Sequence, residues 1–191
     1  MKKKYRWSPV RFAVNMLLLA AVVYACVFVY RSISDMMYPL RYEYYISSSA
    51  HEYGLDKFLV AAVIKTESNF VHDAHSGQAR GLMQLTDETA KWVAGKMNIE
   101  FNTDDVDIPE INIKMGCWYL KYLIDKYGNI DTALAAYNGG MGNVSKWLVD
   151  KRYSDDGKTL KYIPFEETRN YVKKVNDYKK IYEEKYKDMF K

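Results

Sequence analysis

The chain has 191 residues, the length of one ordinary domain with an appendage. It carries 28 basic and 24 acidic residues, but six of the basic residues lie within the first 31 positions, which leaves 22 basic against 24 acidic residues in the remainder. The net charge of +4 therefore reflects one end of the chain and gives no support to a nucleic-acid-binding function. The two cysteines, Cys26 and Cys117, are too few and too far apart for a disulfide framework, and Cys117 is expected to be a small core residue.

The first feature along the chain is a run of 19 residues without charge, from Phe12 to Tyr30, which follows a short basic stretch. This length matches a membrane-spanning helix. The positive-inside rule places the basic end in the cytoplasm and the rest of the chain outside. We predict a cytoplasmic basic tail at 1–11, a single transmembrane anchor at 12–30, a juxtamembrane connector at 31–50 and an extracytoplasmic domain at 51–191.

Two alternatives to an uncleaved anchor remain open. A cleaved signal peptide has a shorter apolar core and small residues at its cleavage site, whereas Val27 and Phe28 at the end of this run are bulky. The stretch Val23-Tyr24-Ala25-Cys26 is loosely similar to a lipobox, which would make Cys26 a lipidated residue. Because Tyr24 is large and the apolar run continues past the cysteine, the pattern favours the anchor.

From His51 onward the pattern is helix after helix, without sustained two-residue alternation and without internal repeats. Thr86 has the character of a helix cap, and Gly128 that of a helix stop. We predict an all-α domain of about 140 residues, which is large enough to bury a core without metals or disulfides. The expected helices are 56–67, 86–97, 110–127, 131–138, 142–150 and 164 to about 186, with an acidic loop at 102–109.

Glu67 is the first candidate functional residue. Val60, Val63 and Ile64 precede it at helical spacing, so the glutamate shares their apolar face at the last turn of the helix. A carboxyl group on a buried face has a raised pKa, which is a requirement for a general acid at neutral pH. The position alone also fits a partly solvated glutamate paired with a lysine.

Downstream stretches add a recognisable set. In chain order they are Glu67-Ser68-Asn69-Phe70, then Ser76 with Ala79-Arg80-Gly81-Leu82-Met83-Gln84-Leu85, then Leu134-Ala135-Ala136-Tyr137-Asn138-Gly139-Gly140, and last Pro164 with Glu167-Thr168-Arg169-Asn170-Tyr171-Val172. The set resembles the transglycosylase domain of the soluble lytic transglycosylases, over roughly residues 51–180. This resemblance implies a goose-lysozyme-like α fold, a peptidoglycan glycan strand as the partner, no cofactor, and cleavage of the MurNAc–GlcNAc β-1,4 bond with formation of 1,6-anhydromuramyl ends.

The resemblance also implies a role for each matching residue. Glu67 matches the catalytic acid and base, and Tyr137 matches a tyrosine whose hydroxyl points at that carboxylate. The remaining matches are implied to bind substrate: Ser76 near the glutamate or the muramyl group, Met83 and Gln84 in the groove, Asn138 beside Tyr137, and Tyr171 on the groove wall.

A second carboxylate is the feature that most glycosidases would require. The Gly81–Gln84 and Tyr137-Asn138 stretches contain none, and Asp73 in the loop has the character of a solvated residue. In the family that the chain resembles, one glutamate acts twice and the C6 hydroxyl of the substrate replaces water as the nucleophile. A hydrolytic muramidase of the same fold and a non-catalytic peptidoglycan-binding scaffold remain alternatives. His72 and His75 lie three residues apart but lack further metal ligands, so no metal site is predicted.

Overall fold

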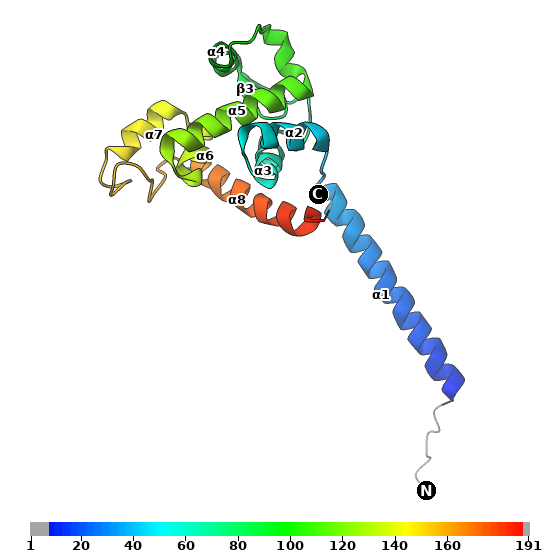
Figure 1. Ribbon diagram of the computed structural model, residues 1–191. Helices are drawn as coiled ribbons and strands as arrows, with labels where there is room; N and C mark the ends of the chain where they lie inside the picture. Colours follow the sequence, from blue (N-terminus) through cyan, green and yellow to red (C-terminus); the bar gives the residue numbers. More distant parts are fainter. Residues whose placement is uncertain (1–7, 189–191) are drawn as a thin grey trace. The chain divides into compact units, whose positions relative to one another are not determined.

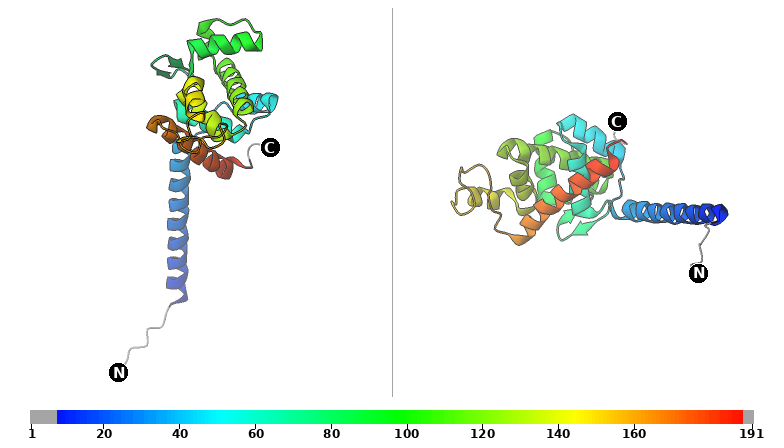
Figure 2. Two further views of the ribbon diagram at one scale, coloured as in Figure 1. Left: turned by 90° about the vertical axis from the view of Figure 1, so that its left-hand side faces the viewer. Right: turned by 90° about the horizontal axis from the view of Figure 1, so that it is seen from below.

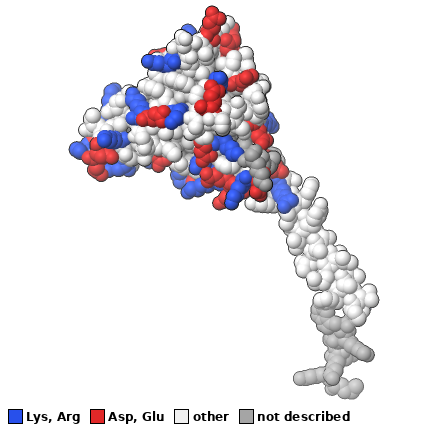
Figure 3. All heavy atoms as spheres, viewed as in Figure 1, with Lys and Arg blue, Asp and Glu red and all other residues white. Residues whose placement is uncertain are grey.

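The computed structural model describes residues 8–188, which form two compact units, one ending at Pro39 and the other beginning at Leu40. The first unit is a single helix, α1 (Pro9–Met37), drawn in dark to light blue in Figure 1. Its best 18-residue window has a mean hydropathy of 2.5, and none of its residues is buried. In length and composition, α1 is therefore suited to cross a membrane. Its surface is mostly uncharged, whereas Lys, Arg, Asp and Glu are interspersed over the visible face of the second unit (Figure 3).

The second unit is a helical domain, as predicted, with one small exception. Three strands of two residues each form an antiparallel sheet in the order β1-β2-β3. They are β1 (His75–Ser76), β2 (Ala79–Arg80) and β3 (Leu85–Thr86). The helices are α2 (Glu43–Tyr53), α3 (Lys57–Ser68), α4 (Asp87–Met97), α5 (Pro109–Tyr127), α6 (Ile130–Gly139), α7 (Met141–Leu148) and α8 (Glu166–Tyr186), with a 3-10 helix, η1 (Thr103–Asp107), before α5.

Helix α3 is the centre of this unit. The Asp56 carboxylate caps its start by accepting a hydrogen bond from the Phe58 N–H at 2.8 Å, and Asn69 ends it in the left-handed conformation. Residues 59–64 are all buried, so α3 is enclosed on most of its sides and not only along one stripe. Helix α8 lies against α3 (Figures 1 and 2), and α2 and α6 both pack on α5. The last turn of α3 thus lies among elements from distant parts of the sequence.

Helix α5 has the ends and the buried face that its sequence predicts. Pro109 occupies its first turn, and Gly128 ends it at a φ of 65°. Cys117 is fully buried in this helix, which confirms the expected core position. Gly116 lies one residue earlier, and the Met83 side chain packs directly against it.

Two segments differ from the sequence-based expectation. The predicted connector, residues 31–50, is divided in the structure, because α1 continues to Met37 and α2 already belongs to the helical domain from Glu43. Ile46 of α2 is fully buried, so this segment forms part of the core and is not a spacer. The acidic stretch that was expected to be a loop contains η1, in which Asn102 and Asp105 form a capping box.

A pair of glycine substitutions tests the close packing between α5 and Met83. A Cβ on Gly116 would lie 2.4 Å from the Met83 sulfur and 2.8 Å from its Cβ, whereas a Cβ on Gly95 in α4 would meet nothing within 4 Å. We expect Gly116→Ala to lower the free energy of unfolding by about 1–3 kcal/mol because the core is overpacked. Gly95→Ala is expected to raise it by about 0.5–1 kcal/mol through helix propensity. Urea unfolding of the full chain in detergent measures both changes, and equal effects at the two sites would contradict the packing described.

Candidate active site

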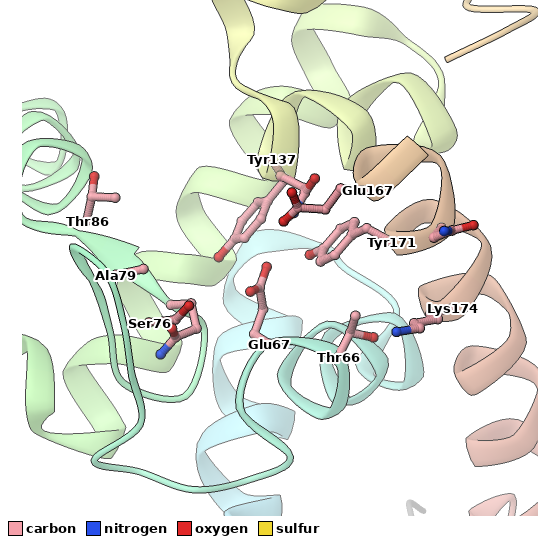
Figure 4. A pocket seen from close by; sticks show the side chains of 12 residues that line it. Thr66, Glu67, Ser76, Ala79, Thr86, Tyr137, Glu167, Tyr171 and Lys174 are labelled. Carbon is pink, nitrogen blue, oxygen red and sulfur yellow. The ribbon is translucent and has the colours of Figure 1, made fainter. Parts of the chain in front are cut away.

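One pocket of about 510 Å³ opens beside the last turn of α3. Six of the seven residues predicted for the site line it: Glu67, Ser76, Gln84, Tyr137, Asn138 and Tyr171. Figure 4 shows the side chains converging from α3, from the small sheet and from helices α6 and α8. The pocket therefore unites all four of the sequence stretches on which the predicted site was based. The remaining lining residues are Thr66, Ala79, Thr86, Glu167, Asn170 and Lys174.

Glu67 lies in the pocket at the end of α3, next to a backbone that is held in place from both sides. The single hydroxyl proton of Ser68 is shared between the Leu82 carbonyl at 2.8 Å and the Ile64 carbonyl at 3.1 Å, which ties the end of α3 to the turn after β2. Burial raises the pKa of Glu67 from its ordinary value of 4.5 to about 7. A carboxyl group with a pKa in this range gains and loses its proton near neutral pH.

Tyr171 is the tyrosine whose hydroxyl faces the Glu67 carboxyl group (Figure 4). The contact falls outside the geometry of a full hydrogen bond, yet it lowers the pKa of Glu67 and so opposes part of the effect of burial. Burial and the nearby Glu67 charge in turn raise the pKa of Tyr171 far above 10. The Tyr171 hydroxyl consequently stays protonated and can donate to Glu67 when the carboxylate is ionised.

Tyr137 also lies near Glu67, since burial and the Glu67 charge together raise the pKa of Tyr137 well above 10. Its hydroxyl donates a 2.9 Å hydrogen bond to the Met83 carbonyl, so this hydroxyl proton is already in use. Its ring lies 5.3 Å from the ring of Tyr119. Tyr137 therefore connects α6 to the turn after β2 and forms a wall of the pocket, while Tyr171 provides the hydroxyl that faces Glu67.

The turn that bears Gln84 is held by Asn112 of α5. The Asn112 amide oxygen accepts from the Met83 N–H at 2.7 Å, and its NH₂ group donates to the carbonyls of Arg80 and Val106 at 3.1 and 2.9 Å. Gly81 has a φ of 80°, and a Cβ there would lie 2.3 Å from the Asn112 amide nitrogen. Only glycine fits at this position, because both the conformation and the approach of Asn112 exclude a side chain.

Gln84 itself is fixed in orientation by its own loop. Its amide nitrogen donates to the carbonyls of Ala74 and Gly81 at 2.9 and 2.8 Å. Its amide oxygen has no hydrogen-bond partner within the described part of the chain. An unpaired buried acceptor is unfavourable, and this one belongs to a residue that lines the pocket.

Met83 and Ser76, both predicted to bind substrate, differ in burial: Met83 is fully buried and Ser76 is exposed. The Met83 side chain is fully buried against Gly116 and does not line the pocket, although its backbone holds both Asn112 and Tyr137. Ser76 is exposed at the rim, in β1, where it pairs with Ala79 across a two-residue turn. The Met83 side chain therefore does not line the groove as expected, and Met83 supports the pocket through its backbone.

Three lining residues of α8 were not singled out from the sequence: Glu167, Asn170 and Lys174. With Tyr171 they are spaced at i, i+3, i+4 and i+7, which places them on one face of the helix. Glu167 brings a second carboxyl group into the pocket, beside Tyr137 and Tyr171 (Figure 4). Glu167 and Asn170 stand beside Tyr171 in the last stretch identified from the sequence, so the helical spacing from Tyr171 was the available signal, although none of the three was assigned a role.

No metal site is found in the described residues, where no group of three or more His, Cys, Asp or Glu side chains is placed to bind an ion. His72, in the loop after α3, and His75, in β1, are both exposed. The pocket presents a carboxyl group with a pKa close to 7, surrounded by amide and hydroxyl groups.

Replacing Asn112 tests whether this side chain holds the turn. Asn112→Leu, which is similar in size, leaves the Met83 N–H and the carbonyls of Arg80 and Val106 without their partner in a buried position. We expect the free energy of unfolding to fall by about 3–5 kcal/mol. Asn143→Leu is the matched control, because it removes one part-buried bond, to the Gly139 carbonyl, and should cost about 1 kcal/mol or less. Similar losses for both variants in urea unfolding would refute the role of Asn112.

The raised pKa of Glu67 makes a second prediction about stability. The native state holds this proton more tightly than the unfolded chain, so ionisation destabilises the fold as the pH rises from about 4.5 through about 7. Glu67→Gln removes that penalty. We expect it to raise the free energy of unfolding by on the order of 2–3 kcal/mol at pH 8.5 and to change it little at pH 4.5. Glu166→Gln, on the exposed first turn of α8, is the control, and a pH-independent effect of Glu67→Gln would contradict the pKa shift.

Comparison with known proteins gives matches over most of the helical domain. Residues 44–160 match the family model described as Transglycosylase SLT domain. A putative soluble lytic murein transglycosylase of Haemophilus influenzae is 34% identical over 150 residues, which is 76% of this chain and 25% of that protein. A membrane-bound lytic murein transglycosylase C of Serratia proteamaculans is 32% identical over 168 residues, 72% of this chain and 45% of that protein.

The solved structures agree with the sequence comparisons. The X-ray structure of an inactive mutant of lytic transglycosylase Slt from Pseudomonas aeruginosa superimposes with a TM-score of 0.70 at 36% identity, covering 79% of this chain and 25% of that one. The chain spans less than half the length of each of these proteins. The matched region contains the end of α3, the small sheet and α6, and thus most of the pocket. The predicted lysozyme-like helical fold is confirmed, and the chain belongs to the Transglycosylase SLT domain family.

Proposed function

We propose that this protein is a peptidoglycan lytic transglycosylase that cleaves the MurNAc–GlcNAc β-1,4 bond and leaves 1,6-anhydromuramyl ends. The observation that carries the proposal is Glu67, whose burial raises its pKa to about 7 inside the pocket. Membership of the SLT family supports the same reaction. A group that is half protonated near pH 7 is suited both to give and to take a proton.

In the first step Glu67 acts as the acid. Its proton passes to the glycosidic oxygen, and the bond from that oxygen to C1 of the muramyl residue breaks. The GlcNAc residue leaves with a new hydroxyl group, and positive charge develops at C1. The ionised Glu67 that remains lies beside that charge.

In the second step Glu67 acts as the base. Its carboxylate takes the proton of the C6 hydroxyl of the same muramyl residue, and the C6 oxygen bonds to C1 to close the 1,6-anhydro ring. Water is not consumed, and Glu67 regains its proton. The hydroxyl of Tyr171 supports this sequence, because it faces the carboxyl group and favours its ionised form between the two steps.

The remaining pocket residues are assigned to substrate binding. Gln84 offers the unpaired amide oxygen that was described above, suited to a sugar hydroxyl or an acetamido N–H. Ser76 and Asn138 add polar groups at the rim and beside the ring of Tyr137. The ring of Tyr137 provides an aromatic wall of the kind on which sugars pack. Met83 acts through its backbone, as the support of Tyr137.

A hydrolytic muramidase is the second candidate, because Glu167 brings another carboxyl group to the pocket. In a hydrolytic reaction this group would activate a water molecule or stabilise the charge at C1. The products of the two reactions differ in mass by one water molecule, so product analysis separates them.

For location, we propose that α1 anchors the enzyme in the cytoplasmic membrane as a single span, with the N-terminus in the cytoplasm and the catalytic domain outside. The support is the apolar length of α1, the basic residues that precede it and a membrane-bound relative. Five residues, 38–42, separate α1 from α2 and reach at most about 20 Å when fully extended. The enzyme would therefore act on glycan close to the membrane.

Digestion of purified peptidoglycan by the full chain in detergent tests the proposed reaction. We expect mass spectrometry to detect 1,6-anhydromuramyl products with the wild type and at least about a hundredfold less with Glu67→Gln, because general acid–base catalysis by one group contributes about 10²–10⁴-fold. Glu166→Gln is the matched control on the exposed side of α8 and should retain full activity. Reducing-end products would indicate the hydrolytic reaction, and unchanged activity of Glu67→Gln would exclude Glu67 as the acid.

A further inference from the structure

The polar face of α8 gives the pocket two oppositely charged ends. Glu167, Tyr171 and Lys174 lie on this face at i, i+4 and i+7, and all three line the pocket. Tyr171 faces Glu67, so Glu167 lies about one turn before the reacting centre and Lys174 about one turn after it. The bond to be cleaved would thus lie between a carboxylate and an ammonium group.

Lys174 is the basic residue of this pocket, since no other Lys, Arg or His is found among its described lining residues. Its neighbours on α8 have ion-pair partners within the protein: Lys173 bonds to Asp177 at 2.7 Å, and Lys179 bonds to Asp56 and Glu183, both at 2.9 Å. Figure 4 shows the Lys174 side chain directed toward Thr66 of α3, at the edge of the pocket. The ammonium group is therefore placed where a ligand would meet it.

The surroundings of Lys174 favour an anion from outside the protein. The Thr66 hydroxyl already donates to the Ala62 carbonyl at 2.8 Å, so it can only accept a further hydrogen bond. Asn170, which lines the pocket one helical turn before Lys174, supplies an amide N–H. The pKa of Glu67 is governed by burial and by Tyr171, so Lys174 does not act by tuning the acid. The charge of Lys174 is therefore available to bind a ligand in the pocket.

We propose that Lys174, together with Asn170, binds a carboxylate of the lactyl-linked peptide of the muramyl residue, and that the enzyme thereby prefers glycan whose peptides keep free carboxylates. This inference rests on the proposed function, because it takes murein as the ligand. A muramyl residue differs from glucosamine by the lactyl group on O3, and the peptide attached there ends in carboxylates. The charge of Lys174 and the amide N–H of Asn170 match the chemistry of such a carboxylate, and both residues line the pocket beside Glu67.

Affinity measurements with two ligands of equal size test this inference. The first ligand is a soluble GlcNAc–MurNAc tetrasaccharide with its peptides, and the second is the same glycopeptide with every carboxylate converted to an amide. Both are titrated into the full chain in detergent with Glu67→Gln, which prevents turnover. Lys174→Met and the matched control Lys173→Met are each compared in that background, with unfolding curves to check that each protein is folded.

We expect Lys174→Met to raise the Kd of the free-carboxylate ligand about threefold to fivefold and to leave the Kd of the amidated ligand unchanged. The difference should shrink between about 0.05 and 0.5 M salt, because an exposed ion pair is screened. Lys173→Met should alter neither Kd, since Lys173 is paired with Asp177. An unchanged Kd for the free-carboxylate ligand, or an equal rise for both ligands, overturns the proposal.

Turnover of the free-carboxylate ligand by the protein with an intact Glu67 separates this inference from the proposed function. Failure to form any 1,6-anhydro product would refute the transglycosylase reaction, while the ligand-specific change in Kd would still report on Lys174. Conversely, normal product formation without a ligand-specific change in Kd would refute only the role of Lys174.

Discussion

The side chain of Asn112 is the contact on which the pocket depends. Its three hydrogen bonds hold the turn between β2 and β3 against α5, and they satisfy backbone groups that are buried or partly buried. The Met83 carbonyl, on the far side of the same turn, accepts from Tyr137. One amide group thus fixes the turn, the turn fixes a pocket wall, and Gly81 is required because Asn112 approaches so closely.

The burial of Glu67 follows from the packing of α3 and not from the glutamate itself. Helix α3 is enclosed because α8 lies along it and because Ser68 ties its end to Leu82. A carboxylate at that end loses much of its water, which raises its pKa. The fold therefore accepts a destabilising group on the wall of its pocket, an arrangement typical of catalytic acids.

The elements with local signals were predicted correctly from the sequence. Asp56, Thr86 and Gly128 mark helix ends by capping and by a left-handed turn, and the helices begin and end within a few residues of them. The small sheet was missed, because strands of two residues show no alternation. Lys174 was missed for another reason. On an isolated helix it belongs to a solvated polar face, and only the docking of α8 on α3 brings it to the pocket.

The two influences on Glu67 correspond to its two proposed tasks. Burial favours the protonated form, which the acid step needs, and the Tyr171 hydroxyl favours the ionised form, which the base step needs. Either influence alone would make one step easier at the expense of the other. A pKa of about 7 is the balance between these two influences, and it suits a single carboxyl group both to donate and to accept a proton. Since the Tyr137 hydroxyl is already bound to Met83, this balance rests on the hydroxyl of Tyr171.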